Sequence, residues 1–501
     1  MWSRFGRAAT TGLVGTTLIG LAASLPGSPF AFKVSGAWFF GVPASSQGVG
    51  IAQAKDLMLL IELACGFTGI VLICRSWLAI HRSLAKGGET RTRWLALILA
   101  GWSVPLLIAP PMFSDDIYSY AAQGEMVSHH INPYLYGPGV LGATPFSALA
   151  QGFWVSTPSP YGPLFDGIDG DIVRLTGHRA LPSIVILRLL SVLGVILMAV
   201  LVPSLARSYG KDPSVAFSLG VLNPLVLLFF ISSGHNDALM IGLLLAGLSL
   251  SRRGHFTAAI IVCTLAGAVK VPGLIGVVAI AWTFDGSDSL WRRCRSVAKA
   301  CVISVVTLEL LSVLFGLGWG WLRTLGASDS VTTWITPVDL AAKVVPHIHV
   351  PTVPFLDAAH VAGPACAIAV GVWALRRLPV IGLPRAMGIA LMAVVLLGPT
   401  VQPWYLLWSI PILAITAGPR TATAIKVLSV AVCLLGAVGL GQLTGELGSL
   451  GLSYEGLLVL VLAASIVVPI QPMSEAARYP LSLARSLRHG RPRLALDARR
   501  A

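Results

Sequence analysis

Apolar runs of roughly 17–25 residues recur along the whole 501-residue chain, and shorter polar and basic segments separate them. A helix of that length crosses the hydrocarbon core of a bilayer. The runs are rich in leucine and lack the alternating pattern of an outer-membrane β-barrel. The pattern therefore predicts an all-α polytopic membrane protein with about 13–14 transmembrane helices. The candidate spans cover residues 8–25, 56–80, 94–111, 181–206, 214–231, 238–251, 257–283, 298–316, 353–375, 386–399, 403–417, 427–440 and 455–471.

Basic segments between the spans indicate the cytoplasmic loops, because Lys and Arg are enriched there. With the N-terminus inside, the alternation holds as far as the run 257–283, which lies between two basic loops. That run is interrupted by VKVPG, where Lys270 precedes the helix-breaking Pro272. Two short helices that meet near the outer face at Lys270 restore the alternation. The basic segments are residues 81–93, 207–211, 252–255, 291–295, 376–377 and the tail from Arg478.

These boundaries predict one transmembrane domain over residues 1–471 and a basic cytoplasmic tail over 472–501. The first run, 8–25, resembles a signal peptide because Arg4 and Arg7 precede it. We favour an uncleaved first span, because no small-residue cleavage site stands out after the run.

The composition supports the membrane class and excludes several others. Only 11% of the residues are charged and 55% are hydrophobic, with a mean hydropathy of +0.81, whereas soluble domains carry about 25% charged residues. We attribute the net charge of +14 to cytoplasmic loops rather than to nucleic-acid binding. The seven cysteines lie mostly in or beside apolar runs without a CxxC pair or a His/Cys cluster. We therefore expect neither a disulfide framework nor a zinc site.

The long segment 112–180 is expected to be an outer loop that carries short amphipathic helices on the membrane surface. A loop of about 70 residues tends to be functional. It contains FSDDIYSY, the pair His129 and His130, NPYLYGP (132–138) and SPYGPLF (159–165). The same topology places SSGHND (232–237), Lys270 and QPWYLLW (402–408) near the outer face.

Asp115 and Asp116 are the candidate catalytic residues. One carboxylate can accept the proton of an incoming hydroxyl, and the other can orient it or raise the pKa of its neighbour. The alternative is a solvated pair or an N-cap, since SDD also suits the start of a helix.

The other candidate residues would bind substrate. His235, Asn236 and Asp237 can bind sugar hydroxyls, a phosphate or a divalent ion, although they are too few for a metal site alone. Lys270 and Arg188 are cations that suit a phosphate. The alternatives are a helix cap for the first group and snorkelling to the interface for the cations. Aromatic residues, which an interfacial belt also explains, can stack on sugar rings; the candidates from these motifs are Tyr161, Trp404 and the adjacent Gln402.

Together these features predict an enzyme that transfers a group from a phosphate-bearing lipid to a hydroxyl outside the membrane. No glycine-rich nucleotide-binding motif follows a candidate strand, so a soluble nucleotide-sugar donor is not expected. One alternative is a transporter or flippase of a lipid-linked sugar, which would share the intramembrane cation and the broken helix. A second is a non-catalytic scaffold, which would not need the paired carboxylates.

The sequence also resembles a known family. The motifs FSDDIYSYAAQGEM, NPY, SPYGPLF, NPLVLLFFISSGHNDALMIGLLLAG and AVK are similar, in order and spacing, to those of the polyprenol-phosphomannose-dependent α-(1→6)-mannosyltransferases MptA and MptB. These enzymes belong to the GT-C superfamily of membrane glycosyltransferases. The likeness covers residues 94–285; the C-terminal half is similar mainly in hydrophobic layout and in its QPWY turn.

The resemblance implies a GT-C fold, a polyprenyl-phosphate mannose donor and a site on the outer side of the plasma membrane. It implies extension of the α-(1→6)-mannan of lipomannan and lipoarabinomannan, with inversion, an Asp base and neither metal nor cofactor. We favour Asp115 as the base because it is nearer the membrane end, with Asp116 as its orienting partner. The chain has a brief basic tail in place of a large outer C-terminal domain, which leaves its acceptor open.

Overall fold

The computed structural model describes residues 2–25, 28–31, 38, 52–87, 92–150, 152–283, 289–326, 336–338, 341 and 352–436. These residues form helices, turns and loops, with no β-strand among them. The predicted all-α class is therefore confirmed. The predicted span 455–471 and the basic tail lie outside the described residues.

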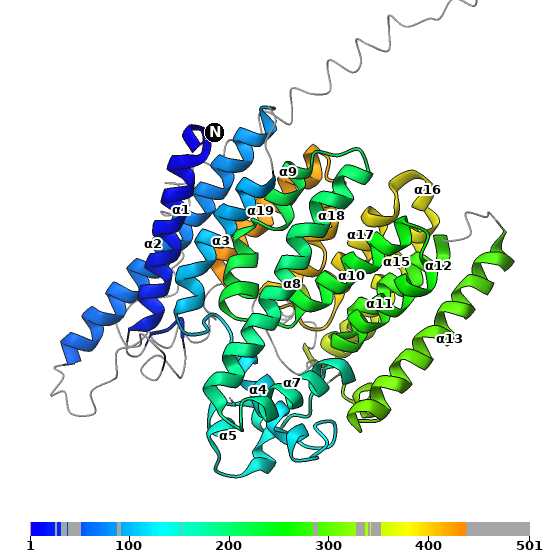
Figure 1. The fold of residues 1–501 in the computed structure, drawn as a ribbon, viewed down its shortest axis with the longest axis horizontal. Coiled ribbons are helices and arrows are strands. Elements are labelled where there is room, and N and C mark those ends of the chain that lie inside the picture. Colours follow the sequence, from blue (N-terminus) through cyan, green and yellow to red (C-terminus); the bar gives the residue numbers. More distant parts are fainter. Residues whose placement is uncertain are drawn as a thin grey trace, which may run out of the picture. The chain divides into compact units, whose positions relative to one another are not determined.

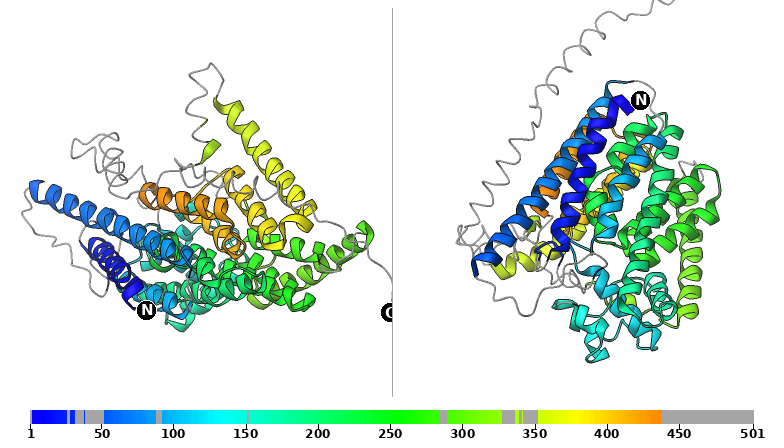
Figure 2. Two further views of the ribbon diagram at one scale, coloured as in Figure 1. Left: turned by 90° about the horizontal axis from the view of Figure 1, so that it is seen from above. Right: turned by 60° about the vertical axis from the view of Figure 1, so that its left-hand side comes forward.

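Three N-terminal helices form one layer: α1 (Trp2–Ser24), α2 (Ala52–Ala85) and α3 (Thr92–Ile108). Both views show α1 alongside α2 (Figures 1 and 2). Glycines permit this approach, because a Cβ on Gly15 would lie 2.8 Å from the carbonyl oxygen of Gly69. Small residues have this role where membrane helices pack closely.

The segment 112–180 folds into a lobe of short helices at one end of the helical body (Figure 1). Short helices were predicted here. However, α4 does not lie amphipathically on a surface, because residues 117–127 are all buried. A Cβ on Gly124 of α4 would lie 2.6 Å from the Asp169 carbonyl oxygen of α7, so α4 and α7 pack backbone to backbone. The lobe consists of α4 (Asp116–Ser128), η2 (Pro138–Leu141), α5 (Pro145–Leu149), α6 (Phe153–Ser156) and α7 (Pro163–Leu175).

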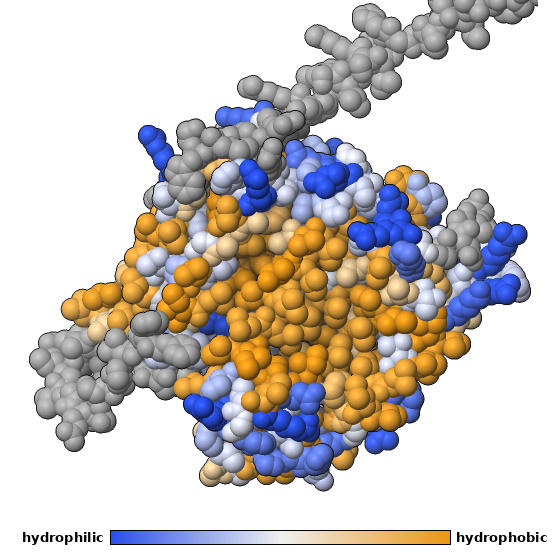
Figure 3. All heavy atoms as spheres, viewed as in Figure 1, coloured by the Kyte–Doolittle hydropathy of each residue, from blue (hydrophilic) through white to orange (hydrophobic). Residues whose placement is uncertain are grey.

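The helix α8 (Ala180–Ser208) shows how the body meets lipid. Large apolar side chains on one of its faces are exposed, at the spacing of three and four residues that marks a helix face. Figure 3 shows apolar side chains gathered between two hydrophilic ends on the face in view. Water would penalise this surface and a bilayer favours it. The exposed residues are Ile186, Leu189, Leu193, Ile196 and Val200.

Broken helices follow α8 and occupy the middle of the chain. The segments η3 (Val226–Ser232) and α10 (Asp237–Arg252) bend by 106° at their junction. The helix α11 (Phe256–Val269) ends at Lys270, and η4 (Val271–Leu274) and α12 (Ile275–Thr283) follow. The predicted interruption at Lys270 is therefore confirmed. The helix α9 (Pro213–Gly220) precedes this group.

The C-terminal helices complete the described part. They are α13 (Leu290–Phe315), η5 (Gly320–Arg323), α15 (Thr352–Arg376), α16 (Leu378–Ile381), α17 (Leu383–Leu397), η7 (Pro403–Trp408), α18 (Ile410–Ile415) and α19 (Pro419–Gly436).

The protein is a membrane protein. Among the described residues, five helices are long and apolar enough to cross a bilayer, or six if the bent pair is one span. Of the 13–14 helices expected, others are broken or are apolar helices of 10–17 residues, and the predicted span 455–471 lies outside the described residues. The five spans are Leu57–Ala85, Ala180–Ser208, Leu290–Phe315, Phe355–Arg376 and Pro419–Gly436.

Candidate active site

The break between η3 and α10 carries three predicted substrate-binding residues. Gly234 stands there with a φ of 79°, which L-residues rarely adopt. A Cβ at Gly234 would also lie 2.6 Å from Ile117 Cδ1 of α4. The break places His235, Asn236 and Asp237 at the start of α10, where all three are buried.

Asp237 and Lys270 form an ion pair between the two helix breaks. Lys270 Nζ lies 2.9 Å from Asp237 Oδ1, and the side chains are 12% and 0% exposed. The indole N–H of Trp408 donates to the same carboxylate oxygen. An ammonium carries three N–H donors, of which Asp237 takes one. The pair therefore presents a cation that can still bind an anion.

Three aromatic rings surround the Lys270 ammonium. Its Nζ lies 4.8 Å from the ring centroid of Tyr405, 5.5 Å from that of Trp408 and 5.6 Å from that of Tyr161. These distances lie in the range of cation–π attraction. The SPYGPLF and QPWYLLW motifs, about 240 residues apart along the chain, thus meet at one lysine.

Asp116 brings the 112–180 lobe into the same group. Its Oδ2 lies 3.4 Å from His235 Nδ1, an ion-pair separation rather than a well-formed hydrogen bond. The His235 ring stacks on Trp404, with centroids 3.9 Å apart and planes inclined by 21°. We call this group of residues the break cluster. Its members are Asp116, His235, Asn236, Asp237, Lys270, Tyr161 and Trp404.

Buried Tyr120 borders the break cluster and contacts its member Tyr161. The Tyr120 hydroxyl donates to Asn236 Oδ1 over 3.5 Å, and its ring meets Tyr161 edge to face at 5.1 Å. Burial raises the pKa of Tyr161, and the Asp116 carboxylate raises it further. Burial, then Tyr161 and Asp116, likewise raise the pKa of Tyr120. Both phenols therefore remain hydrogen-bond donors beside Asp116.

Several buried polar atoms of the break cluster have no hydrogen-bond partner among the described residues. Leaving such atoms unpaired is costly, and native proteins satisfy them with water or ligand. The cluster thus offers donors and acceptors to a polar ligand, as sugar hydroxyls and a phosphate would require. The atoms are Asn236 Nδ2, Asp237 Oδ2, Trp404 Nε1 and both ring nitrogens of His235.

The two adjacent carboxylates have different surroundings. Asp115 occupies the N-cap position of α4, but its side chain makes no capping hydrogen bond. Ser114 Oγ instead accepts the backbone N–H of Asp116. Asp115 interacts electrostatically with Tyr118, whereas Asp116 interacts with His235 and Tyr161. Asp116 is therefore the carboxylate that the fold brings to the break cluster.

Arg188, which the sequence predicted as a phosphate-binding cation, instead donates its hydrogen bonds to backbone carbonyls. It is 2% exposed and donates to the backbone carbonyls of Leu106, Leu107, Ala109 and Ile231. These bonds fix the end of α3 against η3. We therefore leave Arg188 out of the phosphate site that the sequence predicted for it.

The QPWYLLW motif contributes one residue to the site, Trp408, that the sequence analysis did not single out. Gln402 precedes η7, where its backbone carbonyl accepts the N–H of Tyr405. Trp408, not singled out from the sequence, bonds Asp237 and faces Lys270. Its position four residues after Trp404 was the available signal, because residues three and four apart share a helix face.

Comparisons with known proteins give the family. The model of the "Alpha-(1->6)-mannopyranosyltransferase, N-terminal domain" matches residues 9–286, more than half of the chain. The chain belongs to this family. It is accordingly a glycosyltransferase, and the predicted resemblance is confirmed. The family's "MptB C-terminal domain" matches residues 332–473.

Named relatives agree with the family models. A probable α-(1→6)-mannopyranosyltransferase of Mycolicibacterium smegmatis is 33% identical over 427 residues, which is 75% of each chain. The α-(1→6)-mannopyranosyltransferase A of Mycobacterium tuberculosis is 30% identical and covers 72% of each chain. The α-(1→6)-mannopyranosyltransferase B of Corynebacterium glutamicum is 28% identical, covering 72% of this chain and 65% of its own. No solved structure matches the chain.

Proposed function

We propose that the enzyme transfers a mannosyl group from a polyprenyl-phosphate mannose donor to a hydroxyl of an α-(1→6)-mannan acceptor. The names of the relatives support mannose and the linkage. The observation that carries the proposal is the convergence of Asp116, His235, Asp237 and Lys270. The reaction needs a carboxylate to accept the acceptor proton and a cation to bind the donor phosphate, and buried polar groups lie between the two here.

Lys270 binds the donor phosphate in this proposal. Its ammonium lies in an apolar helix break beside aromatic rings, where a lipid phosphate can enter from between helices. Asp237 Oδ1 accepts hydrogen bonds from both the Lys270 ammonium and the Trp408 indole, which holds the lysine in place. Charge-assisted bonds to the phosphate then stabilise the negative charge that develops on the leaving group.

Asp116 is the proposed general base, in place of Asp115. It shares the break cluster with Lys270, and a base must lie near the carbon that bears the phosphate. The acceptor oxygen bonds to the anomeric carbon as the carbon–oxygen bond to phosphate breaks. The acceptor proton goes to Asp116, and the polyprenyl phosphate leaves with the electron pair. One displacement inverts the centre, so a β-linked donor gives an α-mannoside.

The remaining predicted residues orient the sugars. Asn236, with its unpaired amide nitrogen, and His235, with its ring nitrogens, belong to the same break cluster as Asp116 and can bind sugar hydroxyls there. Tyr161 and Trp404 supply apolar faces of the kind that stack on sugar rings. We assign Gln402 to the acceptor side because it opens the η7 segment that carries Trp404.

We further propose that this site faces outward from the plasma membrane and that its acceptor belongs to lipomannan and lipoarabinomannan. The basic loops support the orientation. In the predicted topology the 112–180 lobe and both helix breaks lie on the opposite side of the membrane from the basic loops.

The test uses membranes that contain wild type, Lys270→Gln or the control Lys211→Gln, a substitution in a basic loop. Radiolabelled polyprenyl-phosphate mannose and a short α-(1→6)-mannoside are supplied, and linkage analysis identifies the product. We expect α-(1→6) extension by wild type and control, and at least a hundredfold loss with Lys270→Gln. Absence of extension by wild type would contradict the proposal, and a flipping assay would then test the transporter alternative.

A further inference from the structure

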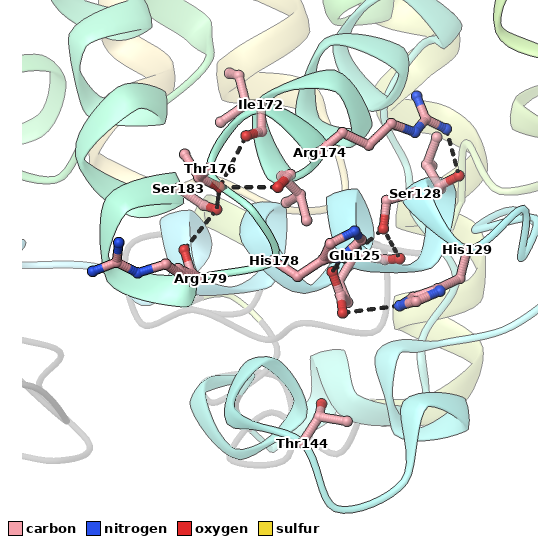
Figure 4. A network of polar contacts seen from close by, with 12 residues as sticks. Glu125, Ser128, His129, Thr144, Ile172, Arg174, Thr176, His178, Arg179 and Ser183 are labelled. Carbon is pink, nitrogen blue, oxygen red and sulfur yellow. Dashed lines mark hydrogen bonds and ion pairs between the residues drawn. The ribbon is translucent and has the colours of Figure 1, made fainter.

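A second group of chemically active side chains lies at the far end of α4 from Asp116. Among the described residues, Glu125, His129 and His178 present one ligand atom each within 4.8 Å of one another. His129 Nε2 lies 3.1 Å from Glu125 Oε1, and His178 Nδ1 lies 2.8 Å from Glu125 Oε2 (Figure 4). The mechanism above uses none of these residues.

The local sequence explains why the three side chains converge. Glu125 and His129 are four residues apart and share one face of α4. The helix α7 ends in a turn in which Gly177 and His178 both have left-handed φ values, 63° and 56°. The N–H of His178 bonds the carbonyl of Val173 in this turn. The turn directs the His178 imidazole to Glu125 (Figure 4).

The distances suit a small metal ion. Zinc binds imidazole nitrogen and carboxylate oxygen at about 2.0–2.2 Å, so its ligand atoms lie about 3.4 Å apart in a tetrahedron. The measured contacts with Glu125 are 2.8 and 3.1 Å. The three ligand atoms lie within 4.8 Å of one another, and the half-exposed side chains of His129 and His178, 54% and 43%, can turn to bring them to the separation that an ion requires. The fourth position would be open to water.

The electrostatic surroundings also favour a cation. The Glu125 side chain is only 9% exposed and carries the one carboxylate of the group. The group lies at the C-terminal ends of α4 and α7, where helix dipoles attract positive charge. Figure 4 shows the guanidinium groups of Arg174 and Arg179 pointing away from Glu125. Ser128 Oγ, 3.3 Å from Glu125 Oε2, can orient the carboxylate.

We propose that Glu125, His129 and His178 bind one divalent transition-metal ion, with Zn²⁺ as the ion that best fits two imidazoles and a carboxylate. Calcium and magnesium prefer oxygen ligands and do not fit this set. The ion joins the last turn of α4 to the connection between α7 and α8. It is structural and separate from the break cluster, since nine residues of helix separate Asp116 from Glu125 by about 13 Å.

This site departs from the sequence-based expectation of no zinc site. Glu125 and His129 showed a suitable spacing, but His178 is 49 residues further along the chain. Only the packing of α4 on α7 joins them.

The experiment measures metal binding directly and does not depend on transfer activity. The full chain is purified in detergent with a tag that contains no histidine, stripped with a chelator and titrated with Co²⁺ and then Zn²⁺. Bound metal is counted by mass spectrometry after desalting, and visible absorption reports the Co²⁺ geometry. Wild type is expected to bind one ion per chain, with the spectrum of a four-coordinate site, and the ion should raise the unfolding temperature.

Three variants decide the outcome. His178→Asn and His129→Asn should each weaken binding at least tenfold and remove the rise in unfolding temperature. His130→Asn is the matched control, because His130 is an exposed neighbour with a φ of 59° that Asn tolerates. The control should bind like wild type. The proposal is overturned if wild type binds no ion after desalting, or if a His129→Asn/His178→Asn double variant binds as well as wild type.

Discussion

Lys270 Nζ lies 2.9 Å from Asp237 Oδ1, although 33 residues separate the two along the chain and each stands beside a different helix break. Each break has a local cause, Gly234 in one case and Pro272 in the other. The pair joins these breaks, and through Asp116 and His235 it reaches the 112–180 lobe. The proposed chemistry depends on this connection.

Breaking the Lys270–Asp237 pair separates its structural role from its functional role. Asp237→Asn leaves a buried ammonium without its counter-charge and is expected to destabilise the protein by about 3 kcal/mol. The double variant Lys270→Gln/Asp237→Asn removes both charges and should recover most of that stability, as measured by thermal unfolding in detergent. Transfer should remain lost in the double variant. Recovered transfer would mean that Lys270 serves the fold alone.

Arg188 should matter for stability rather than for binding phosphate. Arg188→Lys keeps the charge, but one ammonium cannot replace a guanidinium that holds carbonyls on two segments. We expect a loss of about 3 kcal/mol as these buried carbonyls lose their donors. Arg179→Lys, at an exposed position, is the control and should leave the unfolding transition unchanged. Equal stability of the two variants would argue against this assignment.

The lobe should become less stable as the pH rises, because of Asp166. Burial raises the pKa of the Asp166 carboxyl to about 8, although the hydrogen bond from Ser159 and the nearby Tyr134 hydroxyl act against this. In the unfolded chain the group titrates near pH 4. The native state therefore holds a proton that the unfolded state has lost, and stability falls from about pH 4 until the pH passes about 8.

Asp166→Asn keeps a neutral side chain at every pH and tests this relation. Relative to wild type, the variant should gain stability between about pH 5 and pH 8, as measured by denaturant unfolding across that range. Burial also raises the pKa of Asp169, so some pH dependence should remain. A stability difference that does not change with pH would show that Asp166 is already ionised in the native state.

The sequence was sufficient to predict the fold class and the helix break at Lys270. Lys270 and Pro272 in an apolar run predicted a helix break, since both residues are costly there. The polar residues His235, Asn236 and Asp237 were recognised as candidates because they stand at the end of an apolar run. Such predictions need only the local sequence, because a single polar residue or proline within an apolar run is enough to indicate them.

Contacts between distant segments could not be predicted in the same way. Asp115 and Asp116 differ by one position on a helix, and only the packing of α4 decides which one meets His235. The carbonyl partners of Arg188 come from other segments, so the sequence alone could not reveal them. The helix α4 was expected on a surface, yet the lobe buries it. The predicted spans 214–231 and 403–417 are each divided into two shorter helices, because composition does not show where an apolar run bends.

The most direct test of the account compares Asp116→Asn with Asp115→Asn in the mannosyl-transfer assay, at matched protein levels. The two variants lose the same charge on adjacent residues, and each keeps a side chain of the same shape. If Asp116 is the base, Asp116→Asn should lower kcat by at least about a hundredfold, while Asp115→Asn should lower it far less. Transfer retained by Asp116→Asn, or abolished by Asp115→Asn alone, would contradict the assignment of the base.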